Sequence, residues 1–310
     1  MEPFTGNLCS PAVVKELLHK YGLAPQKAFG QNFLINGSIP AQIAQASVPP
    51  AAWQPGFDRE LCALEIGPGL GAMTRELSRL YDRVAAVEID RGLIPLLRET
   101  LAGCDNVTVV NADFMKLSVP EFLKEQFGER EVHVCANLPY YITTPILMRL
   151  LEAVRPSQPP QIRSVTVLVQ AEVADRLCAD AGAENYGSIT ASLNLVGTAE
   201  KILQVSAGNF LPQPKVTSTV VQVRLYPGGV RDAFPNLPED DGALDALIAR
   251  AKLLIGMAFE KRRKTLTNAL SGVASKEAVA NALSELGLRA DIRGERLSAA
   301  EFVALAQKGV

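Results

Sequence analysis

The chain has few of the residues from which metal centres, nucleophilic triads and disulfide frameworks are built. Only two histidines are present, His19 and His133, and neither has a second histidine at ligand spacing. We therefore expect neither a histidine-based metal centre nor a Ser-His-Asp triad. The cysteines are odd in number, scattered and never paired as C-x-x-C: Cys9, Cys62, Cys104, Cys135 and Cys178. We expect them to be buried thiols in a reducing cytosol, with no zinc site or other bound metal.

Long apolar runs are also lacking. No run is long enough to span a bilayer, and the chain does not start with a basic-then-apolar signal peptide. Hydrophobic residues make up 48% of the chain and charged residues 21%, which is typical of a soluble globular protein. We therefore expect a cytoplasmic protein without a membrane partner. A length of 310 residues allows one large domain and a smaller one.

The chain has no large excess of charge of one sign. Its formal net charge of −2 argues against a protein that coats nucleic acid indiscriminately. A local basic face is compatible with that sum, because binding follows clustered charges. The strongest cluster is Lys261-Arg262-Arg263-Lys264, and the alternative interpretation of this run is a solvated helix face.

Short apolar runs alternate with helix-like stretches through the middle of the chain. This alternation predicts a parallel sheet with helices on both faces. Two later runs have no helix between them, so the last two strands are predicted to form an antiparallel pair at the sheet edge. The predicted strands are residues 61–66, 83–88, 107–111, 132–136, 162–170, 201–205 and 217–225.

The two ends of the chain have different patterns. Near the start, Ser10-Pro11 predicts a helix N-terminus, residues 27–34 an ordered loop, and residues 38–47 a short helix. Residues 227–242 are rich in Pro, Gly and Asp, and the pattern beyond them is wholly helical. We predict a domain over 1–228, a linker over 229–242, and a helical domain over 243–310 with helices near 244–258, 276–286 and 298–308. A small bundle that only caps the sheet domain is the alternative for the last segment.

The segment Asn137-Leu138-Pro139-Tyr140 directly follows a predicted strand. Open α/β sheets hold their ligands at the carboxyl ends of their strands. The Asn137 side-chain oxygen and the Leu138 carbonyl can both accept hydrogen bonds from one exocyclic amine, and the Tyr140 ring can stack on the base that carries it. The segment suits chemistry on an amino group of a nucleobase. An ordinary turn is the alternative.

A glycine-rich turn, Glu65-Ile66-Gly67-Pro68-Gly69-Leu70-Gly71-Ala72, follows the first strand of the predicted sheet. Glycine allows the backbone to approach a ligand closely, and the segment also fits a dinucleotide fingerprint. The next two strands end at Glu88, which can take both ribose hydroxyls of an adenosine, and at Asp113, which can accept from an adenine amine. Helix N-caps are the alternative for these acids. Glu65 favours S-adenosylmethionine, whose sulfonium and ammonium it offsets, over a pyrophosphate that it would repel.

Seven motifs, in order along the chain, resemble those of one family. They are Gly30-Gln31-Asn32-Phe33-Leu34, Glu65-Ile66-Gly67-Pro68-Gly69, Val87-Glu88-Ile89-Asp90, Asn111-Ala112-Asp113, Asn137-Leu138-Pro139-Tyr140, Gln170-Ala171-Glu172-Val173-Ala174 and Phe210-Leu211-Pro212-Gln213-Pro214-Lys215-Val216. The chain resembles the bacterial small-subunit ribosomal RNA adenine N6-dimethyltransferases. Related enzymes methylate large-subunit rRNA and confer macrolide resistance, but residues 258–266 and Arg293-Gly294-Glu295-Arg296-Leu297 favour the small-subunit group.

The resemblance implies a fold and a set of site residues. The fold is α/β: a Rossmann-like class I methyltransferase sheet, mostly parallel with an antiparallel last strand, and a smaller C-terminal α-helical domain. In the donor site, Asn32 and Leu34 would close over S-adenosylmethionine, and Gln31 would support their loop. Gly67 and Gly69 would pass under the methionine part of the donor. Glu88 would hold the ribose, and Asp113 would hold the adenine. In the target site, Asn137 and Leu138 would grip the amine between the rings of Tyr140 and Phe210. Lys261, Arg262, Arg263 and Lys264 would contact rRNA phosphates.

The resemblance also implies the reaction. Methyl groups would pass from S-adenosylmethionine to N6 of two adjacent adenosines near the 3′ end of 16S rRNA, giving N6,N6-dimethyladenosine in a 30S or pre-30S particle. A monomer suffices for this. Many amino-methyltransferases have proline where this chain has Leu138, but any residue supplies the carbonyl. The alternatives are a large-subunit rRNA methyltransferase, an assembly factor that acts mainly by binding, and a nicotinamide dehydrogenase, which would leave Asn137 to Tyr140 without a role.

Overall fold

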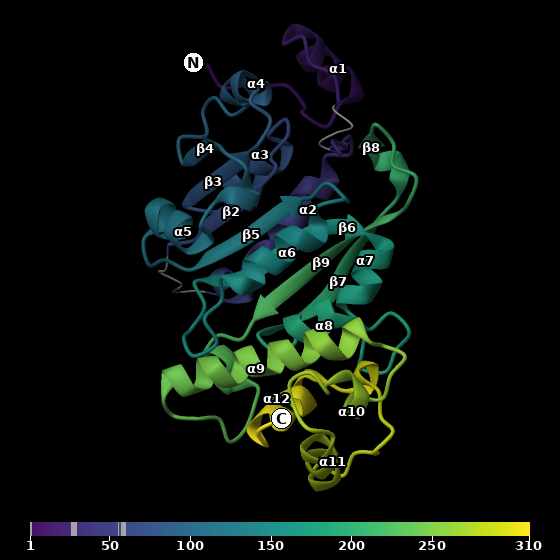
Figure 1. Ribbon diagram of the computed structural model, residues 1–310. Coiled ribbons are helices and arrows are strands. Elements are labelled where there is room, and N and C mark those ends of the chain that lie inside the picture. Colours follow the sequence, from purple (N-terminus) through teal and green to yellow (C-terminus); the bar gives the residue numbers. More distant parts are fainter. Residues whose placement is uncertain (1, 26–29, 55, 57–59) are drawn as a thin grey trace. The chain divides into compact units, whose positions relative to one another are not determined.

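The computed structural model describes residues 2–25, 30–54, 56 and 60–310 (Figure 1). Part of the loop predicted over residues 27–34 therefore lies outside the described residues. Contacts divide the chain into two compact units, each built from three segments. The first comprises Met1–Ala153, Gln161–Ala174 and Glu200–Arg224, and the second comprises Val154–Pro160, Asp175–Ala199 and Leu225–Val310. The second unit thus starts from the C-terminal segment of the predicted division and adds two pieces from the middle of the chain.

A seven-stranded sheet forms the centre of the first unit. Its strands lie in the order β4 (Val107–Asn111), β3 (Arg83–Glu88), β2 (Cys62–Ile66), β5 (Val132–Asn137), β6 (Ile162–Gln170), β9 (Ser218–Leu225) and β7 (Gly197–Val205). Neighbours from β4 to β6 pair in parallel, and β9 pairs antiparallel with β6. The prediction of a mostly parallel sheet with an antiparallel late strand is confirmed. The order places β2, which precedes the glycine turn, between β3 and β5.

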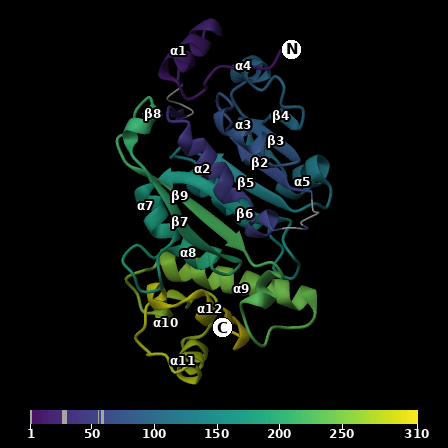
Figure 2. The ribbon, with the colours of Figure 1, turned by 180° about the vertical axis from the view of Figure 1, so that it is seen from behind.

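Helices cover both faces of this sheet, which explains why the central strands are apolar throughout. Strand β2 is buried at every position. On one face, α2 (Ser38–Ser47) and α3 (Ala72–Ser78) enclose a core that includes Ile43, Leu77 and Leu168. Helix α6 (Thr143–Glu152) lies on the other face, as Figures 1 and 2 show together. The remaining helices of the unit are α1 (Pro11–Lys20), α4 (Leu93–Thr100) and α5 (Val119–Phe127).

A second, two-stranded sheet joins the N-terminal segment to the segment between β7 and β9. Strand β1 (Phe33–Leu34) pairs antiparallel with β8 (Phe210–Leu211), so that Leu34 lies opposite Phe210. All but Leu211 of these four residues are buried. The pairing fixes the end of the loop that starts at Gly30. Short 3-10 turns stand nearby and elsewhere in the chain: η2 (Pro50–Trp53), η3 (Phe114–Lys116), η4 (Ala207–Asn209), η5 (Gly229–Asp232) and η6 (Gly294–Arg296).

The second unit is helical. Its long helix α9 (Asp241–Glu260) buries one apolar face, and side-chain caps start α9, α11 (Lys276–Glu285) and α12 (Ala299–Gln307) at Asp240, Ser275 and Ser298. These helices were predicted to within a few residues. The helices α8 (Ser188–Leu193) and α10 (Leu266–Ala269) were not, and α7 (Ala171–Leu177), also missed, is shared by the two units. Within the described residues, no helix is both long and apolar enough to cross a bilayer.

The predicted linker is a packed part of the second unit and not a free spacer. Val230 and Phe234 are buried, and the Val230 backbone N–H donates to the Pro156 carbonyl at 3.1 Å. The ring of Phe234 meets that of Tyr226 edge to face, with centroids 6.4 Å apart. Proline and glycine mark the turns of this segment correctly, but they carry no information on whether those turns pack.

Candidate active site

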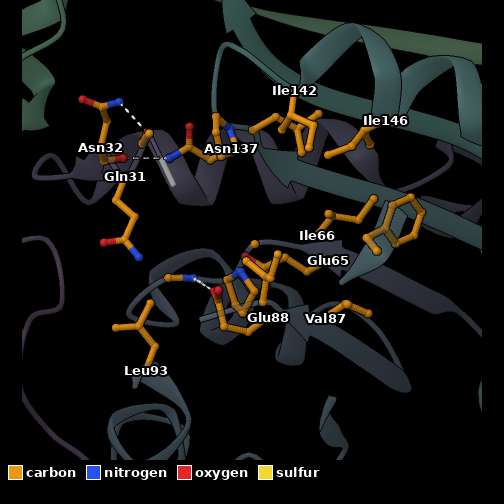
Figure 3. A pocket seen from close by; sticks show the side chains of 18 of the residues that line it. Gln31, Asn32, Glu65, Ile66, Val87, Glu88, Leu93, Asn137, Ile142 and Ile146 are labelled. Atoms are coloured by element: carbon orange, nitrogen blue, oxygen red, sulfur yellow. Dashed lines mark hydrogen bonds between the residues drawn. The ribbon is translucent and has the colours of Figure 1, made fainter. Parts of the chain in front are cut away.

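A pocket lies at the carboxyl ends of the parallel strands in the first unit, where open α/β sheets hold their ligands (Figure 3). Its lining comes from the Gly30 loop, the glycine turn after β2, and the ends of β3, β4 and β5. The pocket brings together ten residues that the sequence assigned to the donor and target: Gln31, Asn32, Leu34, Gly67, Gly69, Glu88, Asp113, Asn137, Leu138 and Tyr140. These residues are spread over more than a hundred positions of the chain, and the sheet order makes them neighbours.

The glycine turn gives the pocket a floor of backbone. Gly67 and Gly69 have φ values of 72° and 58°, which favour glycine. A Cβ at Gly69 would lie 3.3 Å from the Phe33 ring, so the turn and the Gly30 loop approach closely at this point. A Cβ at Gly67 would meet no atom of the described chain within 4 Å, because it would project into open space. This turn can therefore pass beneath a bound molecule.

Glu65, the last residue but one of β2, places a carboxylate inside the pocket lining. Its side chain is 1% exposed, and its Oε2 atom has no hydrogen-bond partner among the described residues. Burial raises the pKa of Glu65 to about 8, the negative charge of Glu88 adds to the rise, and the nearby Thr74 hydroxyl opposes it. A buried carboxyl oxygen without a partner is the arrangement that a cationic ligand would relieve.

Glu88 is buried at the end of β3 and organises two backbone turns. Its Oε2 atom accepts from the Gly69 backbone N–H at 3.2 Å, and its Oε1 atom accepts from the Asp90 backbone N–H at 2.8 Å. Burial raises the pKa of Glu88, and these N–H groups oppose the rise. The carboxylate predicted to hold a ribose therefore also ties the glycine turn to the end of β3.

The Gly30 loop is held by side chains on two sides, and Figure 3 shows the side formed by Asn137. Gln31 Nε2 donates to Asp90 Oδ2 at 2.9 Å, and Asn137 Nδ2 donates to the Asn32 carbonyl at 3.1 Å. The Asn32 side chain in turn donates to the Gly30 carbonyl at 2.8 Å. The sequence did not predict the role of Asp90, although this residue closes the Val87-Glu88-Ile89-Asp90 motif. Its buried carboxylate is the contact that supports Gln31.

Asn137 and Leu138 supply two oxygen acceptors side by side. Since the Asn137 amide nitrogen donates to Asn32, its oxygen is left as an acceptor, and within the described chain it receives no hydrogen bond. The Leu138 carbonyl receives none from the described residues either, whereas the next carbonyl, that of Pro139, accepts from the Ile142 N–H at 3.1 Å. The Leu138 side chain is buried and anchors the turn. The arrangement can bind both hydrogens of an amine.

Tyr140 and Asp113 complete the described walls. The Tyr140 hydroxyl lies 2.8 Å from the Ser218 hydroxyl, and partial burial raises the pKa of Tyr140. This bond fixes the ring, which lines the pocket. Asp113 accepts from the Met115 backbone N–H at 3.0 Å and so caps η3, as its alternative interpretation proposed. Its carboxyl also lines the pocket, so the two interpretations are compatible.

Comparison with known proteins agrees with this geometry. The family model described as ribosomal RNA adenine dimethylase matches residues 23–308. The chain belongs to the ribosomal RNA adenine dimethylase family. It is 37% identical over 305 residues to the ribosomal RNA small subunit methyltransferase A of Shouchella clausii, with 96% of this chain and 94% of the relative covered. It is 38% identical over 306 residues to the protein of the same name from Bacillus cytotoxicus, with 96% of each covered.

Solved structures show the same fold. The 23S rRNA methyltransferase ErmE is 25% identical, with a TM-score of 0.65 over 89% of this chain and 98% of that one. A dimethyladenosine transferase from Plasmodium falciparum is 22% identical, with a TM-score of 0.67 over the same shares. Membership of a dimethylase family makes this chain a methyltransferase and removes the nicotinamide dehydrogenase from consideration.

Phe210, which the family motif suggested as a second aromatic wall, does not line the pocket among the described residues. Its ring is 2% exposed and belongs to the apolar core with Leu34 and Leu168. The reason is the pairing of β8 with β1, which places Phe210 opposite Leu34 and turns the ring inward. Among the described lining residues, Phe210 and Tyr140 therefore do not form the expected pair of facing rings.

The basic cluster lies at the end of α9 in the second unit, and all four of its side chains are exposed. Arg262 differs from the others because it donates to the Tyr186 carbonyl at 3.1 Å and pairs with Glu295 at 3.3 Å. Lys261, Arg263 and Lys264 have no ion pair within the described part of the chain. Three cations are thus available to a partner, and Arg262 is committed to the fold.

The described residues contain no group of three His, Cys, Asp or Glu side chains that could hold a metal ion. His133 is buried in β5 with Nδ1 2.8 Å from the Ser164 hydroxyl, and burial lowers its pKa to about 4. It is absent from the lining of the dimethylase pocket. Among the described residues, therefore, neither a metal site nor His133 supplies a base beside Asn137.

Proposed function

We propose that this protein transfers methyl groups from S-adenosylmethionine to N6 of two adjacent adenosines near the 3′ end of small-subunit rRNA. The product would be N6,N6-dimethyladenosine, formed in the cytoplasm on a 30S or pre-30S particle by a monomeric enzyme. The observation that carries the proposal is the pair of oxygen acceptors at Asn137 and Leu138, next to the glycine turn of an adenine dimethylase. The small-subunit methyltransferases at 37–38% identity support the choice of RNA.

The residues of the pocket fit S-adenosylmethionine. The donor supplies an electrophilic methyl group on a positively charged sulfur. The ionised Glu65 carboxylate, whose Oε2 atom has no partner among the described residues, offsets positive charge, and the open space beside Gly67 leaves room for a ligand against the backbone. We assign the methionine part to Gly67 and Gly69 and the ribose to Glu88. Asp113 is assigned to the adenine, and the cover of the site to Asn32 and Leu34.

Asn137 and the Leu138 carbonyl would act on the amine of the target adenine. Its nitrogen is a poor nucleophile, because its lone pair is delocalised into the ring. Two acceptors that hold its hydrogens favour a pyramidal nitrogen, with the lone pair directed away from the acceptors. The hydrogen bond from Asn137 to the Asn32 carbonyl keeps the amide oxygen in the acceptor position. Orientation and electrostatic complementarity would supply most of the rate enhancement.

No dedicated base is needed at the site. A methylated, positively charged exocyclic nitrogen is strongly acidic and can lose its proton to water. The two histidines are therefore not required for the reaction, which fits the burial of His133 inside the sheet. The target base must leave its stack, and stacking on Tyr140 would offset part of that cost, roughly 1–3 kcal/mol.

The helical segment over residues 243–310 is proposed to bind rRNA. Lys261, Arg263 and Lys264 are exposed at one end of α9 and suit contacts with phosphates. We propose that Arg262 serves mainly to hold this end of the helix, through Tyr186 and Glu295, and contacts phosphate only secondarily.

Methyl mapping tests the proposal. Small subunits that lack the modification are incubated with the protein and labelled donor, and the labelled nucleotides are then located. Label on two adjacent adenosines near the 3′ end of small-subunit rRNA is the expected result. Label in large-subunit rRNA would instead favour the activity that the similarity to ErmE suggests. Tight binding to subunits without label would favour an assembly factor.

A further inference from the structure

One exposed aromatic side chain of the pocket has no part in the proposed methyl transfer. Tyr141 follows Tyr140 directly and lines the pocket, yet its side chain is 61% exposed. Its hydroxyl forms no hydrogen bond within the described part of the chain. Tyr140, by contrast, is fixed by Ser218. A large exposed ring at the rim of a ligand pocket is a surface available to a binding partner.

The Tyr141 ring lies against the Gly30 backbone, and the turn that carries it is held by hydrogen bonds. A Cβ at Gly30 would lie 3.3 Å from the Cδ1 and Cε1 atoms of Tyr141 and 3.0 Å from the Pro139 Cβ, so the Gly30 loop packs against the ring edge. On the chain's other side, the Pro139 carbonyl accepts from the Ile142 N–H and from the Thr143 hydroxyl at 3.2 Å. The backbone that presents the ring is therefore already ordered before a ligand binds.

We propose that Tyr141 stacks on the nucleobase next to the target adenine. The inference rests on the proposed function, in which the target adenine leaves its stack. Its neighbour then loses one stacking partner, and an exposed aromatic ring can replace it. Tyr140 and Tyr141 are consecutive, with Cα atoms about 3.8 Å apart, as target and neighbour are consecutive along the RNA.

The charges of the pocket favour a base face as the occupant of this rim. Glu88 and Asp113 line the pocket, and their carboxylates would repel a phosphate, as would Glu65 once it is ionised. A neutral, flat ring meets no such penalty. Phe210 is buried in the core, and the lining residues Phe33 and Phe114 are buried too, so Tyr141 is the exposed ring beside Tyr140. With two adjacent adenosines as substrate, Tyr141 would hold one while the other is methylated.

The test compares aromatic and non-aromatic replacements on undermethylated small subunits. Tyr141→Leu and Tyr141→Gln should lower kcat/KM for the subunits by about tenfold, because stacking on one ring is lost. Tyr141→Phe and Tyr141→Trp should stay within about threefold of the natural protein, since any aromatic ring can stack. Donor affinity, measured by calorimetry, should be unchanged in all four. Trp53→Leu is the matched control, because Trp53 is 60% exposed but does not line the pocket.

Full activity of both non-aromatic variants would overturn the inference. Equal loss in the aromatic and non-aromatic variants, or a parallel loss of donor affinity, would overturn it too, because Tyr141 would then only shape the pocket. Thermal melting verifies that each variant is folded. Failure of the unmodified protein to methylate small subunits would overturn the proposed function itself, and the two failures are thus separable.

Discussion

Replacing Glu65 with glutamine should make the protein more stable at alkaline pH while weakening donor binding. The pKa of Glu65 is raised to about 8 in the folded chain, against about 4.3 in an unfolded one. Folding therefore takes up a proton between these values. The stability that this carboxyl contributes is fully present below about pH 4.3 and is lost as the pH rises through 8, by about 1.4 kcal/mol per pH unit.

The loss in the free energy of unfolding is at most about 5 kcal/mol, and relaxation of the site reduces it. Glu65→Gln should therefore raise the free energy of unfolding by about 2–5 kcal/mol at pH 8.5 and by almost nothing at pH 4.5. Donor affinity changes with pH in the opposite direction to stability, because only the ionised Glu65 carboxylate offsets the donor's positive charge. In the natural protein, donor affinity should rise between pH 6 and 8, and in the variant it should not.

Urea unfolding and calorimetric donor titration at several pH values measure both effects. Glu129→Gln is the matched control, since that side chain is 87% exposed and the same change removes a solvated charge. A stability of the natural protein that does not fall between pH 5 and 8.5 would refute the account of Glu65. So would a donor affinity that is equally pH-dependent with and without this carboxyl.

Three further predictions follow from single contacts. Gln31→Leu should weaken donor binding by about tenfold, because a hydrogen bond to the Asp90 carboxylate is lost. Adding Asp90→Asn to this variant should weaken binding little further. Calorimetric affinities in which the two losses add would count against the pairing of Gln31 with Asp90. Gly294→Ala should destabilise the protein by about 1–3 kcal/mol in thermal melts, because the new Cβ would lie 2.4 Å from the Ala258 Cβ. Gly256→Ala is the control and should not destabilise the protein, because its new Cβ would lie in open space. The double variant Arg263→Glu, Lys264→Glu should bind small subunits more weakly and with a flatter salt dependence, measured by filter binding from low to high salt. Lys124→Glu, which reverses another exposed charge, is the control. An unchanged salt dependence would mean that the basic cluster is only a solvated face.

The parallel strands were predictable because the signal for each is local. β2, β3, β4 and β6 are short apolar runs with turn residues after them, and β2 and β6 are buried almost throughout. Since parallel strands share one carboxyl edge, the positions after them also predicted the pocket, with Gly67, Glu88 and Asn137 at its walls.

The features that were missed depend on contacts between distant parts of the chain. Phe210 belongs to a motif that suggests a pocket wall, but its pairing with Leu34 across β1 and β8 buries it. The contact between Gln31 and Asp90 likewise joins a loop to a strand end far along the chain. Val230 lies among glycines and polar residues that predict a linker, and only tertiary packing shows that it is buried.

The exposure of Tyr141 is another tertiary property. In the sequence, Tyr140 and Tyr141 are the same residue type after the same proline, and nothing local distinguishes them. The fold gives Tyr140 the Ser218 hydroxyl as a partner and leaves Tyr141 at the pocket rim.

The most direct test of the central claim is the separation of catalysis from donor binding in Asn137→Ala. The account predicts that methyl transfer to undermethylated small subunits falls by about 10²–10³-fold, because one of two acceptors for the target amine is lost. Donor affinity should fall only a few-fold, through the loss of the contact with the Asn32 carbonyl. An equal fall in both quantities would contradict the account, because Asn137 would then only build the donor pocket.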